Sequence, residues 1–139
     1  LWQDGSWNSR VRLWVVRGGH AEKNVITPSW DAREPLVAAS TDGPRGKLAV
    51  VKTGLKLSRR GVLVTLFGPD PYSGKTLLRL WEQAGKSGSL TVNLPADFKA
   101  AKAVPVNLRG EPAGAALKIR KGAFNFKLGA FAPASFRLE

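Results

Sequence analysis

The stretch Ser89-Leu90-Thr91-Val92-Asn93-Leu94 decides the fold class of this chain. Its apolar residues alternate strictly with polar residues, so one side of an extended chain would be apolar and the other polar. Successive side chains of a strand point to opposite faces, and such alternation is typical of a strand buried on one face only. The stretch therefore predicts a half-buried β-strand.

The same alternation returns twice nearer the C-terminus, in residues 117–120 and 124–128. Between them lies Arg120-Lys121-Gly122, whose glycine can adopt the positive φ that a tight turn demands. The two stretches therefore predict a β-hairpin with one apolar face and one basic face.

Other stretches add strands to this pattern. Residues 61–67 are apolar on both faces, which predicts a central strand covered on both sides, and residues 76–82 are similar. The remaining predicted strands are residues 11–16, 35–38, 48–51, 104–108 and 134–138, and the only helical candidate is residues 97–103. Many short strands separated by Gly- and Pro-rich turns predict an all-β fold, an antiparallel two-sheet β-sandwich with little or no helix.

Composition fits one ordinary domain, with 139 residues of which 43% are hydrophobic. The chain has no Cys, so it can form neither a disulfide nor a zinc–cysteine site. It also has no Met, even at position 1, and Leu1 is not a residue before which the initiator Met is usually removed. We therefore expect a piece of a longer protein. No signal peptide or membrane-spanning run is visible, and the sequence assigns no cellular compartment.

The net charge of +12 raises the question of nucleic-acid binding. Such a surface needs basic residues interleaved with exposed aromatics. Lys118, Arg120 and Lys127 share one strand face, but alternation places Phe124 and Phe126 on the other. Nucleic acid is therefore not the expected partner.

Candidates for catalysis are few. His20 is the only His, so a Ser–His–Asp triad or a histidine metal site would depend on it alone. The spacing of the carboxylates pairs none of them as a general acid and base. Five Trp residues and Tyr72 could offer stacking platforms to a sugar, although burial in a core is the more usual fate of Trp.

A family resemblance is carried by several motifs. They are Phe67-Gly68-Pro69-Asp70-Pro71, Thr76-Leu77-Leu78-Arg79-Leu80-Trp81-Glu82-Gln83-Ala84-Gly85-Lys86-Ser87-Gly88, Val106-Asn107-Leu108-Arg109-Gly110-Glu111-Pro112-Ala113-Gly114, and Ala130-Phe131-Ala132-Pro133-Ala134-Ser135-Phe136-Arg137-Leu138. Together they resemble the C-terminal β-domain of bacterial α-mannosidase-like proteins of glycoside hydrolase family 38. The likeness covers residues 28–139, and Arg79-Leu80-Trp81-Glu82 is its most specific part.

The resemblance implies a supporting role. In that family the zinc ligands and the Asp nucleophile lie in an N-terminal α/β domain, whose motifs have no counterpart in this sequence. No catalytic residue, metal ligand or cofactor is therefore expected in this chain, and zinc is expected in the missing catalytic domain. Loops of the family's β region can edge the active-site cleft, so the carbohydrate-contacting or cleft-edge candidates are Asp70, Tyr72, Trp81 and Glu82.

These observations lead to one main hypothesis and two alternatives. Residues 1–27 are expected to form an N-terminal strand region and a Trp-rich edge that once faced another domain, and residues 28–139 the sandwich, within one domain overall. The main hypothesis is a non-catalytic domain that packs on the N-terminal catalytic domain of the same parent chain, an α-mannosidase-like glycoside hydrolase. The alternatives are a carbohydrate-binding module and a basic nucleic-acid-binding domain.

Overall fold

The computed structural model describes residues 5–6, 8–9, 11–17, 26–33, 37–40, 42–44, 46–47, 51–70 and 73–139. Within them the elements are α1 (Thr27–Arg33), β1 (Lys56–Leu57), β2 (Val62–Pro69), β3 (Thr76–Glu82), β4 (Gly88–Asn93), β5 (Lys102–Pro105), β6 (Leu117–Lys118), β7 (Ala123–Leu128) and β8 (Pro133–Leu138).

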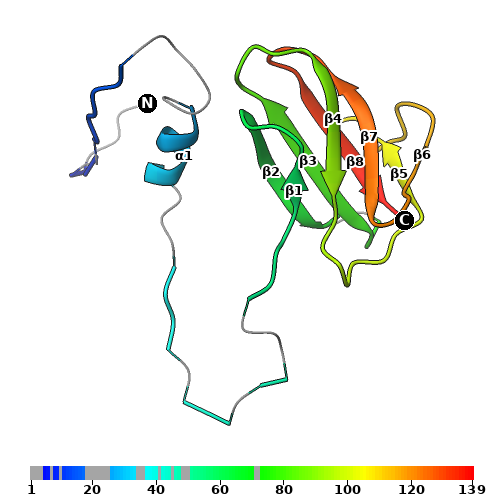
Figure 1. The fold of residues 1–139 in the computed structure, drawn as a ribbon, viewed down its shortest axis with the longest axis horizontal. Coiled ribbons are helices and arrows are strands. Elements are labelled where there is room, and N and C mark those ends of the chain that lie inside the picture. The colour runs from blue at the N-terminus through cyan, green and yellow to red at the C-terminus, as the bar shows by residue number, and fades with distance from the viewer. Residues whose placement is uncertain are drawn as a thin grey trace.

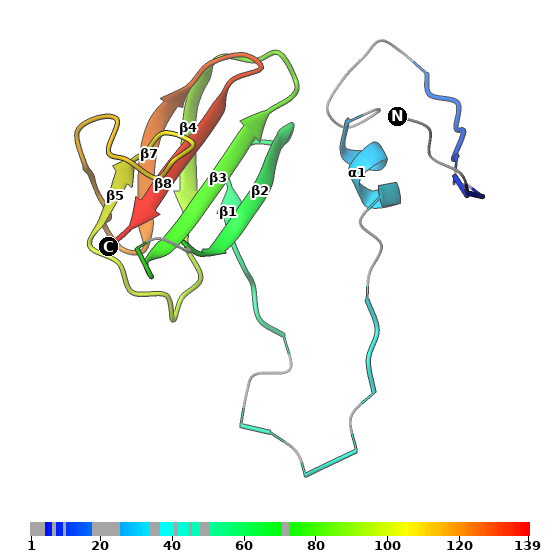
Figure 2. The same ribbon diagram turned by 180° about the vertical axis from the view of Figure 1, so that it is seen from behind.

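The strands form two antiparallel sheets that face each other (Figures 1 and 2). One sheet has the order β1-β4-β7 and the other the order β2-β3-β8-β5-β6. The predicted all-β sandwich with very little helix is therefore confirmed. In Figures 1 and 2 the short helix α1 lies beyond the β2 edge, outside the two layers.

The core lies between the sheets. It is formed by the apolar residues of the alternating stretches from which the strands were predicted. Leu90 and Val92 of β4 are fully buried, and the polar residues between and beside them are not. Phe124 of β7 meets Phe136 of β8 across the core edge-to-face, with ring centroids 5.1 Å apart. Each large apolar side chain buried in this way contributes about 1.5–3 kcal/mol to stability.

Strand β3 lies between β2 and β8 in the larger sheet, and it is covered on both faces. Leu78 and Leu80 face the core, while Leu77 on the opposite face is also buried. The loop after β5 lies on that outer face, where Arg79 Nη2 donates to the carbonyl oxygen of Leu108 at 3.0 Å. An apolar sequence with few polar interruptions is the expected pattern for such a strand.

The prediction that residues 61–67 form a central strand is wrong, because β2 lies at the edge of its sheet. A bulge between Val64 and Leu66 explains part of the misreading. Val64 lies opposite Leu80 and Phe67 opposite Leu78, so both are on the same face of the sheet although their numbers differ by three. The extra residue reverses the alternation halfway along the strand, and the sequence therefore looks apolar on both faces.

The predicted hairpin around Gly122 is confirmed at its turn and wrong beyond it. Lys121 and Gly122 both have positive φ, 50° and 72°, as a two-residue type I′ turn requires. The backbone groups of Arg120 and Ala123 exchange hydrogen bonds of 2.9 and 3.0 Å across this turn. However, β6 pairs with β5 and β7 pairs with β4, so the chain changes sheets here.

The helical candidate at residues 97–103 is also wrong. Phe98 N donates to the carbonyl oxygen of Pro95 in a turn, and β5 begins at Lys102 because residues 103–105 pair with β8. The observed helix is α1, which the sequence pattern did not predict. Pro28 in its first turn and Arg33 in its last turn are both favourable helix-end residues.

The strands predicted before residue 56 are not formed by the residues that the structure describes there. Residues 11–16 belong to no strand, so the strand predicted there is not formed. Of those predicted at 35–38 and 48–51, residues 37, 38 and 51 belong to no strand, and the others lie outside the described residues. All described strands fall within residues 56–138.

Candidate functional site

Glu82, the last residue of β3, is fully buried and holds two turns together. Its Oε1 accepts hydrogen bonds from Arg59 Nη1 and Ala84 N, both at 3.1 Å. Its Oε2 accepts hydrogen bonds from Gly85 N and Phe131 N, both at 2.9 Å. One carboxylate therefore ties the loop after β3 to the turn before β8.

The protonation of Glu82 follows from these contacts. Burial raises its pKa, but the backbone hydrogen bonds from Phe131, Lys86 and Ala84, together with the bond from Arg59, outweigh burial and lower the pKa below its ordinary value. An ionised carboxylate with both oxygens engaged is not poised to donate a proton near neutral pH. Glu82 was predicted as a cleft-edge residue. In the structure its carboxylate holds the loop after β3 and the turn before β8 together.

Asp70 lies in the turn between β2 and β3 and is also buried. Its Oδ2 accepts a hydrogen bond of 2.5 Å from Ser73 Oγ, and its backbone groups bond to Lys75 and Gly74. This arrangement is the local turn chemistry in which Asp commonly takes part. Tyr72, the candidate next to it, lies outside the described residues, as does His20.

Trp81 is the candidate that remains accessible, with 47% of its surface exposed. Its Nε1 donates to the carbonyl oxygen of Phe131 at 3.2 Å, which fixes the indole ring against the turn before β8. Phe131 is itself exposed. The end of β3 therefore presents two neighbouring aromatic side chains to solvent.

The structure does not bring the described candidates together. Asp70 precedes β3 and Glu82 ends it, and a strand of seven residues spans about 20 Å. A carboxylate pair across one glycosidic bond needs a separation below about 10 Å. Asp70 and Glu82 thus belong to opposite ends of the sandwich, and at the Glu82 end the accessible side chains are those of Trp81 and Phe131.

A hollow at that end contains residues that sequence reasoning missed. It has a volume of about 430 Å³ and is lined by Ile26, Ser29, Trp30, Arg33, Trp81, Glu82, Gln83 and Phe131. Helix α1 reaches the sandwich here, where Trp30 Nε1 donates to Gln83 Oε1 at 2.7 Å. The helix was not predicted, so no sequence signal placed Trp30 and Arg33 beside Trp81.

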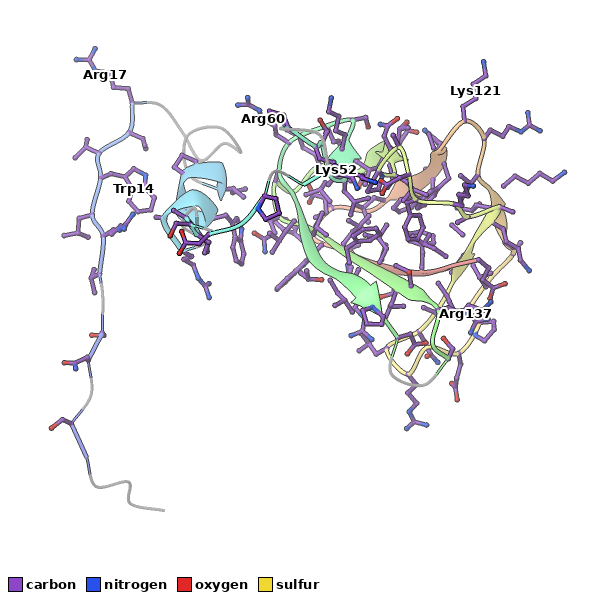
Figure 3. All side chains as sticks on the ribbon, turned by 90° about the horizontal axis from the view of Figure 1, so that it is seen from below. Trp14, Arg17, Lys52, Arg60, Lys121 and Arg137 are labelled. Carbon is purple, nitrogen blue, oxygen red and sulfur yellow. The ribbon has the colours of Figure 1, made fainter. Side chains whose placement is uncertain are left out.

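The basic residues of the β6–β7 region lie apart from the aromatic ones. Lys118, Arg120 and Lys127 are exposed, whereas Phe124 is buried and Phe126 is partly buried in the core cluster. In Figure 3 the side chain of Lys121 projects from the same region into solvent. Charge and stacking surfaces are thus separated in space, as the alternation predicts.

Two further properties concern only the residues that the structure describes. No group of three His, Cys, Asp or Glu side chains is placed to hold a metal ion among them. Nor does this part of the chain contain a helix that is long and apolar enough to cross a membrane. No protein-family model, curated protein or solved structure matches the chain.

Proposed function

We propose that this chain is a non-catalytic β-sandwich domain that packs on and supports the catalytic domain of an α-mannosidase-like glycoside hydrolase. The resemblance of residues 28–139 to the C-terminal β-domain of family 38 proteins supports the identity of the parent enzyme. The local engagement of both buried carboxylates, Asp70 in its turn and Glu82 with Arg59, supports a structural use of these groups.

The single observation that carries the docking role is the exposure of the segment Val11-Arg12-Leu13-Trp14-Val15-Val16-Arg17. Leu13 is 93% exposed and Val15 is 99% exposed, and residues 11–16 belong to neither sheet of the described strands. A run of six residues that contains three Val, one Leu and one Trp is typical of a buried strand. An exposed apolar surface of this kind is typical of a protein–protein contact.

The segment is separated from the sandwich in the structure. Figure 3 shows Trp14 and Arg17 on the far side of α1, and Figure 1 shows the same segment away from both sheets. The occupant that we propose for it is the edge of a sheet in the parent's preceding domain. Strand addition of this kind gains backbone hydrogen bonds together with the burial of alternate side chains.

Zinc chemistry would belong to the parent's catalytic domain. This chain's own residues would contribute contact surface: the apolar segment 11–17, and the rigid end of β3 that the Glu82 hydrogen bonds hold in place. Rigid elements at the border of a catalytic cleft help to hold the substrate-positioning groups in their productive geometry.

The docking role is tested in the full-length product of the parent gene. The double variant Leu13→Asp with Val15→Asp should lower the temperature at which that enzyme is thermally inactivated by several degrees, because it places two carboxylates in a proposed apolar contact. The matched control is Val37→Asp with Val51→Asp, which changes two residues that are similarly exposed but lie outside the segment. In the 139-residue chain alone, both double variants should leave the melting temperature unchanged.

Three outcomes would overturn the proposal. The first is equal heat inactivation of the two double variants in the full-length product. The second is a full-length product that has no glycoside hydrolase domain, and the third is turnover by the 139-residue chain alone. That chain should release no product from 4-nitrophenyl α-mannoside, with or without added zinc.

Carbohydrate binding is the second candidate function, and one observation favours it. Trp81 at the end of β3 and Phe131 in the turn before β8 are joined by a hydrogen bond, and both are exposed instead of being buried in the core. Amphipathic aromatic rings with one accessible face are typical of binding surfaces.

A further inference from the structure

The hollow between α1 and the end of β3 has the composition of a small-molecule site. Its volume of about 430 Å³ falls within the range of about 300–1,000 Å³ that is usual for ligand pockets. Aromatic side chains form much of its wall, and a small number of polar groups converge on it. This is the general make-up of a site that binds an organic molecule by its apolar surface and orients it by a few hydrogen bonds.

Phe131 is held in this wall at a cost to stability. Its φ is +54°, in the left-handed region that residues with a side chain rarely adopt, yet 65% of its surface is exposed. Burial of the ring therefore does not explain why a phenylalanine occupies a position that suits glycine. Strained residues that gain little from packing are enriched at functional sites.

Surrounding contacts keep the Phe131 ring in place. Its backbone N donates to Glu82 Oε2 at 2.9 Å, and its carbonyl oxygen accepts the Trp81 indole N–H. The ring lies so close to Gly85 that a Cβ at that position would be 2.7 Å from its Cζ atom. Trp81 and Phe131 both line the hollow and are held by these hydrogen bonds, and the two side chains are together called the aromatic platform.

Hydrogen-bond donors also line the hollow. Gln83 Oε1 already accepts the Trp30 indole N–H at 2.7 Å, so the donating part of the Gln83 carboxamide is its NH₂ group. The Arg33 guanidinium lies 4.9 Å above the centre of the Trp30 ring and adds further N–H donors. The Glu82 carboxylate has both oxygens engaged, so the wall offers mainly donors to a ligand.

We infer that this hollow binds one pyranose unit of a glycan. A pyranose presents an apolar C–H face that can stack on Trp81 and Phe131, and ring and hydroxyl oxygens that can accept hydrogen bonds from Gln83 and Arg33. The inference rests on the second candidate function and names its site and ligand class. It does not depend on docking to a catalytic domain, which involves residues 11–17 instead.

The experiment titrates the ¹⁵N-labelled chain with the methyl glycosides of mannose, glucose and galactose, each to about 20 mM, because a single sugar unit is expected to bind with a millimolar Kd. At least one glycoside should shift the indole N–H resonances of Trp81 and Trp30 in a saturable manner. Trp81→Ala should weaken binding about fivefold or more by removing the stacking surface. Trp14→Ala is the matched control, because Trp14 is similarly exposed but lies outside the hollow, and it should leave the Kd unchanged.

Phe131→Gly separates binding from folding. This variant removes half of the platform and relieves the positive φ, so it should weaken binding while the melting temperature is retained or raised. Unchanged binding in Phe131→Gly, or the absence of saturable shifts with all three glycosides, would overturn the inference. Those outcomes would leave the docking role standing, since the latter is measured by heat inactivation of the full-length product.

Discussion

Residues 11–17 and strand β4 have similar apolar side chains but opposite surroundings. In β4, Leu90 and Val92 are fully buried between two sheets. In the N-terminal segment, Leu13 and Val15 are almost fully exposed. Strand-forming residues therefore become a strand only where a neighbouring strand supplies hydrogen-bond partners and a second layer covers the apolar face. The sandwich provides both for β4, and the described strands provide neither for residues 11–16.

The largest expected effect is a cavity in the core. Leu78→Ala removes a fully buried side chain at the centre of β3 and should lower the free energy of unfolding by about 2–5 kcal/mol. The matched change in the other region, Leu13→Ala, should alter it by less than about 0.5 kcal/mol. Urea unfolding of both variants measures the difference. A similar loss in the two variants would show that Leu13 is buried in solution.

Next in size is the loss of the buried carboxylate. Glu82→Gln keeps the shape of the side chain but loses the charge that pairs with Arg59, and it turns an NH₂ group toward backbone N–H donors. We expect a loss of about 2–3 kcal/mol, because hydrogen bonds to a charged group are stronger than neutral ones and a partner is left unpaired. A stability equal to that of the parent chain would mean that the two turns do not depend on this carboxylate.

The same carboxylate gives the stability a pH dependence. The pKa of Glu82 is lower in the folded chain than its ordinary value, so the unfolded chain takes up the proton first as the pH falls. The contribution of Glu82 is therefore fully present above the ordinary Glu pKa of about 4.3 and is lost as the pH falls further toward the folded value. Urea midpoints measured from about pH 7 to about pH 3 should fall less steeply in Glu82→Gln than in the parent chain. Equal slopes would contradict the lowered pKa.

A smaller effect is expected at the turn that supports Phe131. Gly85→Ala meets both a positive φ of 71° and the Phe131 ring, and should cost about 2 kcal/mol. Gly74→Ala is the matched control, because its φ is +65° but nothing lies within 4 Å of the new Cβ, and it should cost about 1 kcal/mol. Thermal unfolding of the two variants isolates the contact with Phe131, and an equal loss would show that the ring moves aside freely.

Alternation predicted the sandwich because burial on one face leaves a period of two in the sequence. The pattern at Leu90 and Val92 gave the right element and the right inward face. The pattern could not reveal the bulge after Val64, which reverses the facing of later residues, or the change of sheet after Ile119. Both depend on partners that are distant in the sequence.

The candidate site was less accessible to prediction. Trp81 could be named as a candidate from the sequence because it belongs to a distinctive motif, and the structure shows that it is exposed and lines the hollow. Glu82 could not be distinguished from an exposed carboxylate, because its partners Arg59 and Phe131 lie 23 and 49 residues away. The positive φ of Phe131 is the reason for treating that residue as part of a site. No sequence pattern predicts a positive φ for a residue with a side chain.

Hydrogen exchange of the 139-residue chain, read by mass spectrometry, tests most directly whether the sandwich is complete without a partner for residues 11–17. Amides of β3, β4, β7 and β8 should exchange only through opening events close to global unfolding. Amides of residues 11–17 should exchange as fast as those of an unstructured peptide. Protection of residues 11–17 comparable to that of β4 in the chain alone would contradict the account, because the segment would already have its strand partner.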